Sequence, residues 1–229
     1  MQIDTVTRYA FKPFIGSSHN WAMRHCASIS APAKILDVGP GSAMLGKRLQ
    51  ERGGYDLYAL EVYEPAIEYL RTIYARVEHS LTPFQDERFD LILLLDVIEH
   101  MTHPFEFFKE AAALLKPGGV LLLSVPNIAH WTVRLALLCG CFPYAPRGIL
   151  DSTHYQFFNR RRFNALLADT PELMVVRKEA SIEPLELLLP TMLWDNCVFR
   201  AIAKLRLKAA NFWPGPLAYQ HLAVLKRRD

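Results

Sequence analysis

ILDVGPGSAMLG, residues 35–46, is the stretch of sequence that decides the fold. It begins as a short apolar strand, reaches Asp37, turns through Gly39, Pro40 and Gly41, and continues with helical spacing. In an open parallel sheet, ligands bind where the carboxyl ends of the strands meet the starts of the helices. Glycine has no Cβ, so Gly39 and Gly41 let the backbone approach such a ligand closely. The stretch therefore predicts a ligand-binding strand–turn–helix unit.

Asp37, the acid in this unit, indicates which class of ligand the turn binds. A dinucleotide-binding turn reads G-x-G-x-x-G, but Met44 stands at the last position of that pattern. Asp37 would repel a pyrophosphate, whereas S-adenosylmethionine carries an ammonium, a sulfonium and no phosphate. Glu61, twenty residues after Gly41 at the end of the next apolar run, can accept hydrogen bonds from both ribose hydroxyls, and Val62 or Tyr63 can cover the adenine. These residues predict S-adenosylmethionine as cofactor and argue against a nicotinamide-dependent oxidoreductase.

Apolar runs and helical segments alternate after this unit, which predicts parallel strands joined by helices. The fold class is therefore α/β: a Rossmann-like doubly wound sheet, mostly parallel with an antiparallel edge, plus helical cap elements. The expected strands are 34–39, 56–62, 89–97 and 120–127, with the antiparallel edge from 172–181 and 218–227; the expected helices are 43–53, 64–76 and 103–119. We expect a single domain over 1–229, with a helical lead-in (1–33), a cofactor-binding core (34–127) and a cap and sheet-edge region (128–229).

The amino-acid composition and net charge limit the classes of function to consider. Hydrophobic residues make up 51% of the 229 residues, enough for a sizeable core, and a net charge of +3 gives no reason to expect a nucleic-acid partner. The four cysteines lack the spacing of a metal or redox site, so we expect no metal there and free thiols in the cytoplasm. No apolar run approaches the roughly 20 residues of a membrane span.

The segment 182–213 is helical in pattern and amphipathic, and it carries four basic residues, Arg200, Lys204, Arg206 and Lys208. Packing on the sheet is the simplest interpretation. The segment could instead cover the ligand site, or make a weak peripheral contact with an anionic membrane.

The motifs described above resemble those of class I S-adenosylmethionine-dependent methyltransferases. ILDVGPGSA (35–43) resembles the first motif of that family, with Ala43 in place of the usual third glycine, and FDLILLLDVIEH (89–100) resembles the block around the fourth strand. SSH (17–19), GILDSTHYQFF (148–158) and LAYQ (217–220) resemble a bacterial subgroup associated with glycosyltransferases and polysaccharide biosynthesis. The resemblance covers most of the chain. It implies methyl transfer to a small-molecule or glycan acceptor.

Candidate residues for the chemistry follow from position. Methyl transfer to oxygen or nitrogen needs a base for the acceptor's proton, and histidine suits that role near neutral pH. His154 and His130, with Glu99, are the catalytic candidates; each histidine could equally be a structural, hydrogen-bonded one. Asp96 is expected to line the cofactor site, and the resemblance suggests that His19 closes over the cofactor.

Two functions stay open at this point. One is an enzyme that methylates a hydroxyl or amine of a small metabolite or a sugar-containing acceptor. The other is a non-catalytic S-adenosylmethionine-binding partner in a biosynthetic complex. The acceptor and the oligomeric state do not follow from these residues.

Overall fold

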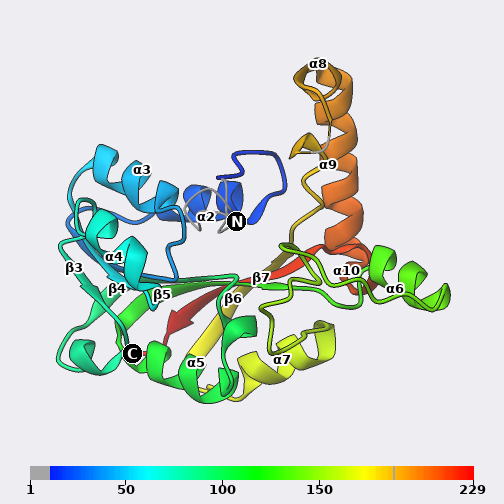
Figure 1. Ribbon diagram of the computed structural model, residues 1–229. Helices are drawn as coiled ribbons and strands as arrows, with labels where there is room; N and C mark the ends of the chain where they lie inside the picture. The colour runs from blue at the N-terminus through cyan, green and yellow to red at the C-terminus, as the bar shows by residue number, and fades with distance from the viewer. Residues whose placement is uncertain (1–10, 188) are drawn as a thin grey trace.

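The computed structural model describes residues 11–187 and 189–229, which form a seven-stranded sheet with helices on both faces (Figure 1). The strands are β1 (Ala33–Val38), β2 (Tyr55–Leu60), β3 (Arg76–Glu78), β4 (Phe89–Leu95), β5 (Leu115–Pro126), β6 (Leu173–Ala180) and β7 (Gln220–Arg227). The helices are α2 (Ser18–Cys26), α3 (Met44–Arg52), α4 (Glu64–Leu70), α5 (Pro104–Ala113), α6 (Trp131–Leu138), α7 (Arg160–Ala168), α8 (Thr191–Trp194), α9 (Cys197–Phe212) and α10 (Pro214–Leu217), with short 3-10 turns η1 (Thr82–Phe84), η2 (Ile98–His100) and η3 (Leu185–Leu187).

The strand order β3-β2-β1-β4-β5-β7-β6 confirms the predicted Rossmann-like class. The first five strands in this order run parallel, while β7 is antiparallel to both β5 and β6. The two C-terminal strands therefore build the antiparallel edge that the sequence predicts, with β6 outermost.

Successive side chains of the central strands point alternately to the two faces of the sheet and pack into two hydrophobic cores, one on each face. On β4, Ile92 and Leu94 face the core that contains Phe108 of α5 and Phe163 of α7. Leu91 and Leu93 face the opposite core, which α2, α3 and α4 complete. These four side chains are fully buried, whereas Leu95 at the end of the strand is partly exposed. Such burial is expected for a central parallel strand covered on both faces.

The carboxyl ends of the parallel strands lie level with one another. Val38 pairs with Leu60 of β2 and with Leu94 of β4, and Leu60 pairs in turn with Glu78 of β3. Residues that immediately follow these strands therefore gather along one edge of the sheet, where this fold class binds its ligands.

The helix expected over 64–76 is shorter than predicted. It ends at Leu70, and the chain turns to form β3, a strand that the sequence reading did not assign. Two contacts explain the early end: the backbone N–H of Ala75 donates to the carbonyl of Leu57, and the side chain of Tyr74 turns inward to Asp37. Similarly, α5 ends at Ala113, and Lys-Pro-Gly-Gly at 116–119 lies within β5, not in the predicted helix.

The amphipathic segment at 182–213 packs on the sheet through one face only. Ala203 and Ala210 of α9 are buried in a small core with Ala180, the last residue of β6, and Ile182. The rest of the helix stands away from the sheet (Figure 1). None of the described helices has the length and hydrophobicity needed to cross a membrane. Residues 1–10 of the predicted lead-in, and Leu188, lie outside the described residues. The division into lead-in, core and cap stays a prediction.

Candidate active site

The turn after β1 has the strained backbone typical of a ligand-binding loop. Gly39, Gly41 and Ala43 all have positive φ, at 62°, 55° and 55°. A Cβ on Gly39 would lie 2.9 Å from a methyl of Val97, so only glycine fits there. The left-handed conformation costs an alanine about 1 kcal/mol, so the substitution of the third glycine by Ala43 is tolerated at a modest cost. Ala43 is the N-cap of α3 and makes no side-chain cap, which leaves the first N–H groups of the helix for another partner.

Asp37 is buried at the end of β1 and has a specific partner. The hydroxyl of Tyr74 donates a 2.6 Å hydrogen bond to its Oδ2. Burial raises the pKa of Asp37 to about 7, against the lowering effect of this hydrogen bond and with a further increase from the charge of Glu61. Gly46 makes the contact possible, because a Cβ there would lie 2.2 Å from the Tyr74 hydroxyl. The sequence reading missed Tyr74 and Gly46 because neither belongs to the turn motif.

Glu61, the acid at the end of β2, lies at the next strand end. Its Oε1 accepts hydrogen bonds of 2.9 Å from the backbone N–H groups of Val62 and Tyr63. Val62 is 72% exposed and Tyr63 is 40% exposed, so an apolar surface is open beside the carboxylate. This arrangement of one carboxylate and two uncovered apolar side chains suits a ribose and an adjoining base.

Asp96 immediately follows β4 and has a left-handed backbone conformation, with φ of 57°. Its carboxylate joins three strands, because the Ser124 hydroxyl of β5 donates to Oδ1 at 2.6 Å and the Gln220 amide of β7 donates to Oδ2. The Ser181 hydroxyl extends this network by donating to the side-chain Oε1 of Gln220 at 2.6 Å. Burial raises the pKa of Asp96, while these donors act against the shift. A left-handed aspartate in a polar network is a typical feature of a functional strand end, and Ser124 and Gln220 are members that the sequence reading did not find.

Glu99 and His154 come together although they are far apart in the sequence. Glu99 is 1% exposed, and its Oε1 lies 3.8 Å from Nε2 of His154. Burial raises the pKa of Glu99 well above its usual range, and the charge of Asp96 adds to the shift. Burial also lowers the pKa of His154 to about 4, with a second contribution from His100, so this imidazole is neutral at pH 7.

The third catalytic candidate, His130, has structural partners at both ring nitrogens. It is fully buried, with Nδ1 at 2.8 Å from the Thr132 hydroxyl and Nε2 at 2.8 Å from Oε1 of Glu183. Burial acts to raise the pKa of Glu183, but hydrogen bonds, that of His130 first, lower it to about 2. Glu183 also pairs with Arg206 of α9. This cluster ties the start of α6 to α9.

His19 lies in the first turn of α2, close to the described N-terminal segment. Its Nδ1 accepts a 3.0 Å hydrogen bond from the backbone N–H of Lys12, and its ring stacks on Phe11 at 5.3 Å. Burial, with the Lys12 charge, lowers the pKa of His19 to about 4. A role for His19 in closing over the cofactor stays a prediction.

The strand ends thus bring the predicted residues into two groups. Asp37 and Glu61, together with the turn at 39–43, follow β1 and β2. Asp96, Glu99 and His154 gather beyond β4. His130 belongs to a separate set of contacts around Glu183. Asp37, Gly39, Pro40, Gly41, Glu61, Val62 and Asp96 all lie at or just beyond the carboxyl ends of their strands.

Comparisons with known proteins agree with this geometry. Residues 20–170 match the model of a family described as a methyltransferase domain. A ubiquinone biosynthesis O-methyltransferase of Caulobacter vibrioides is 30% identical over 152 residues, which cover 61% of this chain and 59% of that protein. The chain thus aligns with less than two thirds of the length of such curated relatives.

Solved structures share the fold across almost the whole chain. An S-adenosylmethionine-dependent methyltransferase from Archaeoglobus fulgidus superimposes with a TM-score of 0.60 at 14% identity, covering 94% of this chain and 97% of that one. A 1,6-didemethyltoxoflavin-N1-methyltransferase from Burkholderia thailandensis, solved with S-adenosylhomocysteine, gives 0.54 at 16% identity, covering 93% and 77%. At such identities the likeness concerns the fold alone, whereas the family model covers more than half of this sequence. The chain therefore belongs to the class I S-adenosylmethionine-dependent methyltransferases.

Proposed function

We propose that this chain transfers a methyl group from S-adenosylmethionine to a hydroxyl oxygen of a small molecule. The observation that carries the proposal is the alignment of strand ends, which places a buried acid after β1, a second acid beside open apolar side chains after β2, and a buried Glu99–His154 pair beyond β4. The first two groups suit the cofactor. The third suits an acceptor that must lose a proton.

On the cofactor side, each residue meets one part of the ligand. Asp37 balances the cationic amino-acid end of S-adenosylmethionine, and the turn from Gly39 to Gly41 lets the backbone approach it closely. Glu61 accepts from the ribose hydroxyls and exchanges its present backbone donors, Val62 and Tyr63, for the sugar. The exposed side chains of the same two residues cover the adenine.

On the acceptor side, we propose that His154 and Glu99 handle the proton that the acceptor's hydroxyl loses: His154 accepts it, and Glu99 lies beside His154. The acceptor's oxygen attacks the methyl carbon in line with the carbon–sulfur bond, and the electron pair of that bond returns to sulfur. His154 is neutral at pH 7 because burial lowers its pKa, so its Nε2 is able to take the proton that the hydroxyl releases. Oε1 of Glu99 lies 3.8 Å from that nitrogen, and the imidazolium that forms would in turn favour the ionised form of Glu99.

The choice of oxygen as acceptor atom rests on the relatives, which are named O-methyltransferases. An amine or a sugar-containing acceptor, the latter suggested by resemblance to polysaccharide-associated enzymes, is the alternative. We place the reaction in the cytoplasm, in keeping with the cysteine pattern.

Turnover is the test of this proposal. The purified chain is incubated with S-adenosylmethionine and one of four acceptor sets: phenols and hydroxylated quinone-related compounds, aliphatic alcohols, sugar nucleotides, and amines. Release of S-adenosylhomocysteine with an acceptor that gains 14 mass units, from the phenolic set before the others, is the expected result. Tight cofactor binding by calorimetry without turnover in any set would instead identify a non-catalytic binding partner.

We further propose that α9 rests on an anionic membrane surface. Val198, Ile202, Leu205 and Phe212 recur at helical spacing as one exposed stripe, and Phe212 is 92% exposed. Lys204 and Lys208 run along one side of this stripe, at positions i and i+4. A helix with an apolar stripe beside lysines matches the interface of a bilayer that contains anionic lipid. Such a contact would bring the enzyme to acceptors that are dissolved in the membrane.

A further inference from the structure

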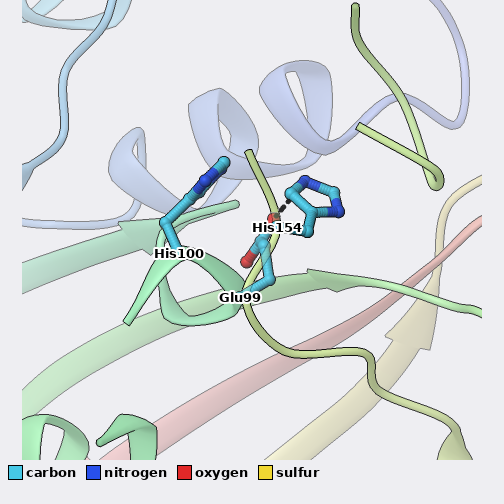
Figure 2. A group of neighbouring side chains, drawn as sticks. All are labelled: Glu99, His100 and His154. Atoms are coloured by element: carbon cyan, nitrogen blue, oxygen red, sulfur yellow. Dashed lines mark ion pairs between the residues drawn. The ribbon is translucent and has the colours of Figure 1, made fainter. Parts of the chain in front are cut away.

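Glu99, His100 and His154 form a compact group beyond β4 (Figure 2). Each offers one ligand atom, and these three atoms all lie within 4.8 Å of one another. Two hydrogen bonds hold the group together across 55 residues of sequence, because the backbone N–H groups of Tyr155 and Gln156 donate to the Glu99 carbonyl at 3.0 and 2.9 Å. The loop that carries His154 is thereby fixed against η2.

The hydrogen bonds of the two histidines decide which ring nitrogen carries a proton. Nδ1 of His154 lies 3.2 Å from the Ile149 carbonyl, and Nδ1 of His100 lies 3.1 Å from the Thr153 carbonyl. A carbonyl oxygen only accepts, so each Nδ1 must carry the hydrogen. In a neutral imidazole the other nitrogen, Nε2, is then left with a bare lone pair.

Glu99 contributes a buried carboxyl group to this cluster. Within the described part of the chain, neither of its carboxylate oxygens has a hydrogen-bond partner, although the side chain is 1% exposed. Nε2 of His154 lies 3.8 Å from Oε1 of Glu99, which is too far for a hydrogen bond. Burying a carboxylate without any partner is unfavourable. A cation placed between the three groups would give the Glu99 carboxylate the partner that it lacks and would favour its ionised form.

We propose that Glu99, His100 and His154 bind one divalent transition-metal ion, such as Zn²⁺, Mn²⁺ or Fe²⁺. Two imidazoles and one carboxylate favour these ions over Mg²⁺ and Ca²⁺, which prefer ligand sets made of oxygen alone. Each histidine already donates its other ring N–H to a backbone carbonyl, which is the usual outer contact of a metal-bound histidine. The sequence reading assigned no metal to this chain, because it looked for metal ligands only among the cysteines.

The metal gives the acceptor half of the site a specific chemistry, and this step rests on the proposed function. With the ion bound, His154 would act as a ligand and not as the base: the acceptor's hydroxyl oxygen would take an open position on the ion, the pKa of the hydroxyl would fall, and its proton would leave to solvent. The resulting oxygen anion attacks the methyl carbon, and the electron pair of the carbon–sulfur bond goes to sulfur. Acceptors with two adjacent oxygen atoms are favoured, since both can bind the same ion.

Metal binding is tested directly on the full chain. The protein is stripped with chelator, dialysed against Zn²⁺ or Mn²⁺, and measured by elemental analysis and by titration calorimetry. We expect one ion per chain. His100→Gln and His154→Gln should each weaken binding by at least about 100-fold, more than the loss typical of an outer contact. His103→Gln is the matched control, because His103 lies three residues from His100 and is 75% exposed; it should bind like wild type.

The same titrations separate this inference from the proposed function. S-adenosylmethionine affinity is measured on each stripped protein, and circular dichroism reports whether each variant is folded. If the folded wild type retains no ion, or if His103→Gln loses as much affinity as His154→Gln, the metal site is wrong whatever the cofactor does. If the ion binds but S-adenosylmethionine does not, the metal site stands and the proposed function fails.

Discussion

Asp37→Asn should make the ligand-free protein more stable at alkaline pH, although it removes a group that we propose contacts the cofactor. Burial raises the pKa of Asp37 to about 7, whereas an aspartate in the unfolded chain titrates near 3.9. Between these values the folded chain holds a proton that the unfolded chain has lost. Wild-type stability therefore falls as pH rises from about 4 to about 7, and asparagine does not have this dependence.

The size of the effect follows from the two pKa values. Between pH 5 and pH 8, linkage gives a relative gain of about 2.5 kcal/mol in the free energy of unfolding for Asp37→Asn over wild type. Urea unfolding of both proteins at the two pH values measures it. Equal stability differences at pH 5 and pH 8 would mean that Asp37 titrates normally, and the reasoning would be refuted.

Tyr74→Phe provides the internal check. Its hydroxyl donates to Asp37, and removing a hydrogen bond to a buried carboxylate costs about 1–3 kcal/mol. This cost should appear at pH 8, where Asp37 is ionised, and shrink in the Asp37→Asn background, so the double-mutant cycle gives a coupling energy. S-adenosylmethionine affinity of the wild type should rise with pH up to about 7 and be weak and flat for Asp37→Asn.

The remaining predictions concern the ribose, the base and the membrane. Glu61→Ala should weaken S-adenosylmethionine binding by about 1–3 kcal/mol in calorimetry; unchanged affinity would move the ribose contact elsewhere. His154→Gln should lower kcat by about 100-fold with cofactor affinity retained, whereas His130→Gln should lower stability by about 1–3 kcal/mol in urea unfolding because Glu183 loses its buried partner. Leu205→Gln should reduce flotation with phosphatidylglycerol vesicles, while Met174→Gln, at an exposed position on β6, should not; equal behaviour of the two would exclude α9 as the membrane contact.

The fold was predictable because its central strands are continuous apolar runs. β1 and β4 are buried on both faces, and such runs between helical segments have few other interpretations. β3 escaped detection for the opposite reason: it has three residues, of which only Val77 is fully buried. β3 forms because its backbone pairs with β2, and its own three residues carry no apolar pattern that would predict a strand.

The site was predictable where it depends on strand ends and not where it depends on long-range contacts. Asp37, Glu61 and Asp96 follow apolar runs, so their common edge is implied by the parallel sheet. The approach of His154 to Glu99 depends on backbone hydrogen bonds between η2 and a loop that is distant in the sequence. Hydrophobic periodicity within a short segment carries no information about such long-range contacts. Tyr74 reaches Asp37 only because position 46 lacks a side chain.

The buried acids Asp37 and Glu99 lie at the same edge of the sheet but in different environments. Both are buried with raised pKa values, but Asp37 has a hydroxyl donor at 2.6 Å and Glu99 has none among the described residues. A carboxylate that keeps one donor is held in position and needs only the charge of a cationic ligand. A carboxylate with no donor, facing unprotonated imidazole nitrogens, needs a cation or a proton of its own. These different environments support our proposal that Asp37 serves the cofactor and Glu99 the acceptor, a division of roles that tuned pairs of carboxylates have in other enzymes.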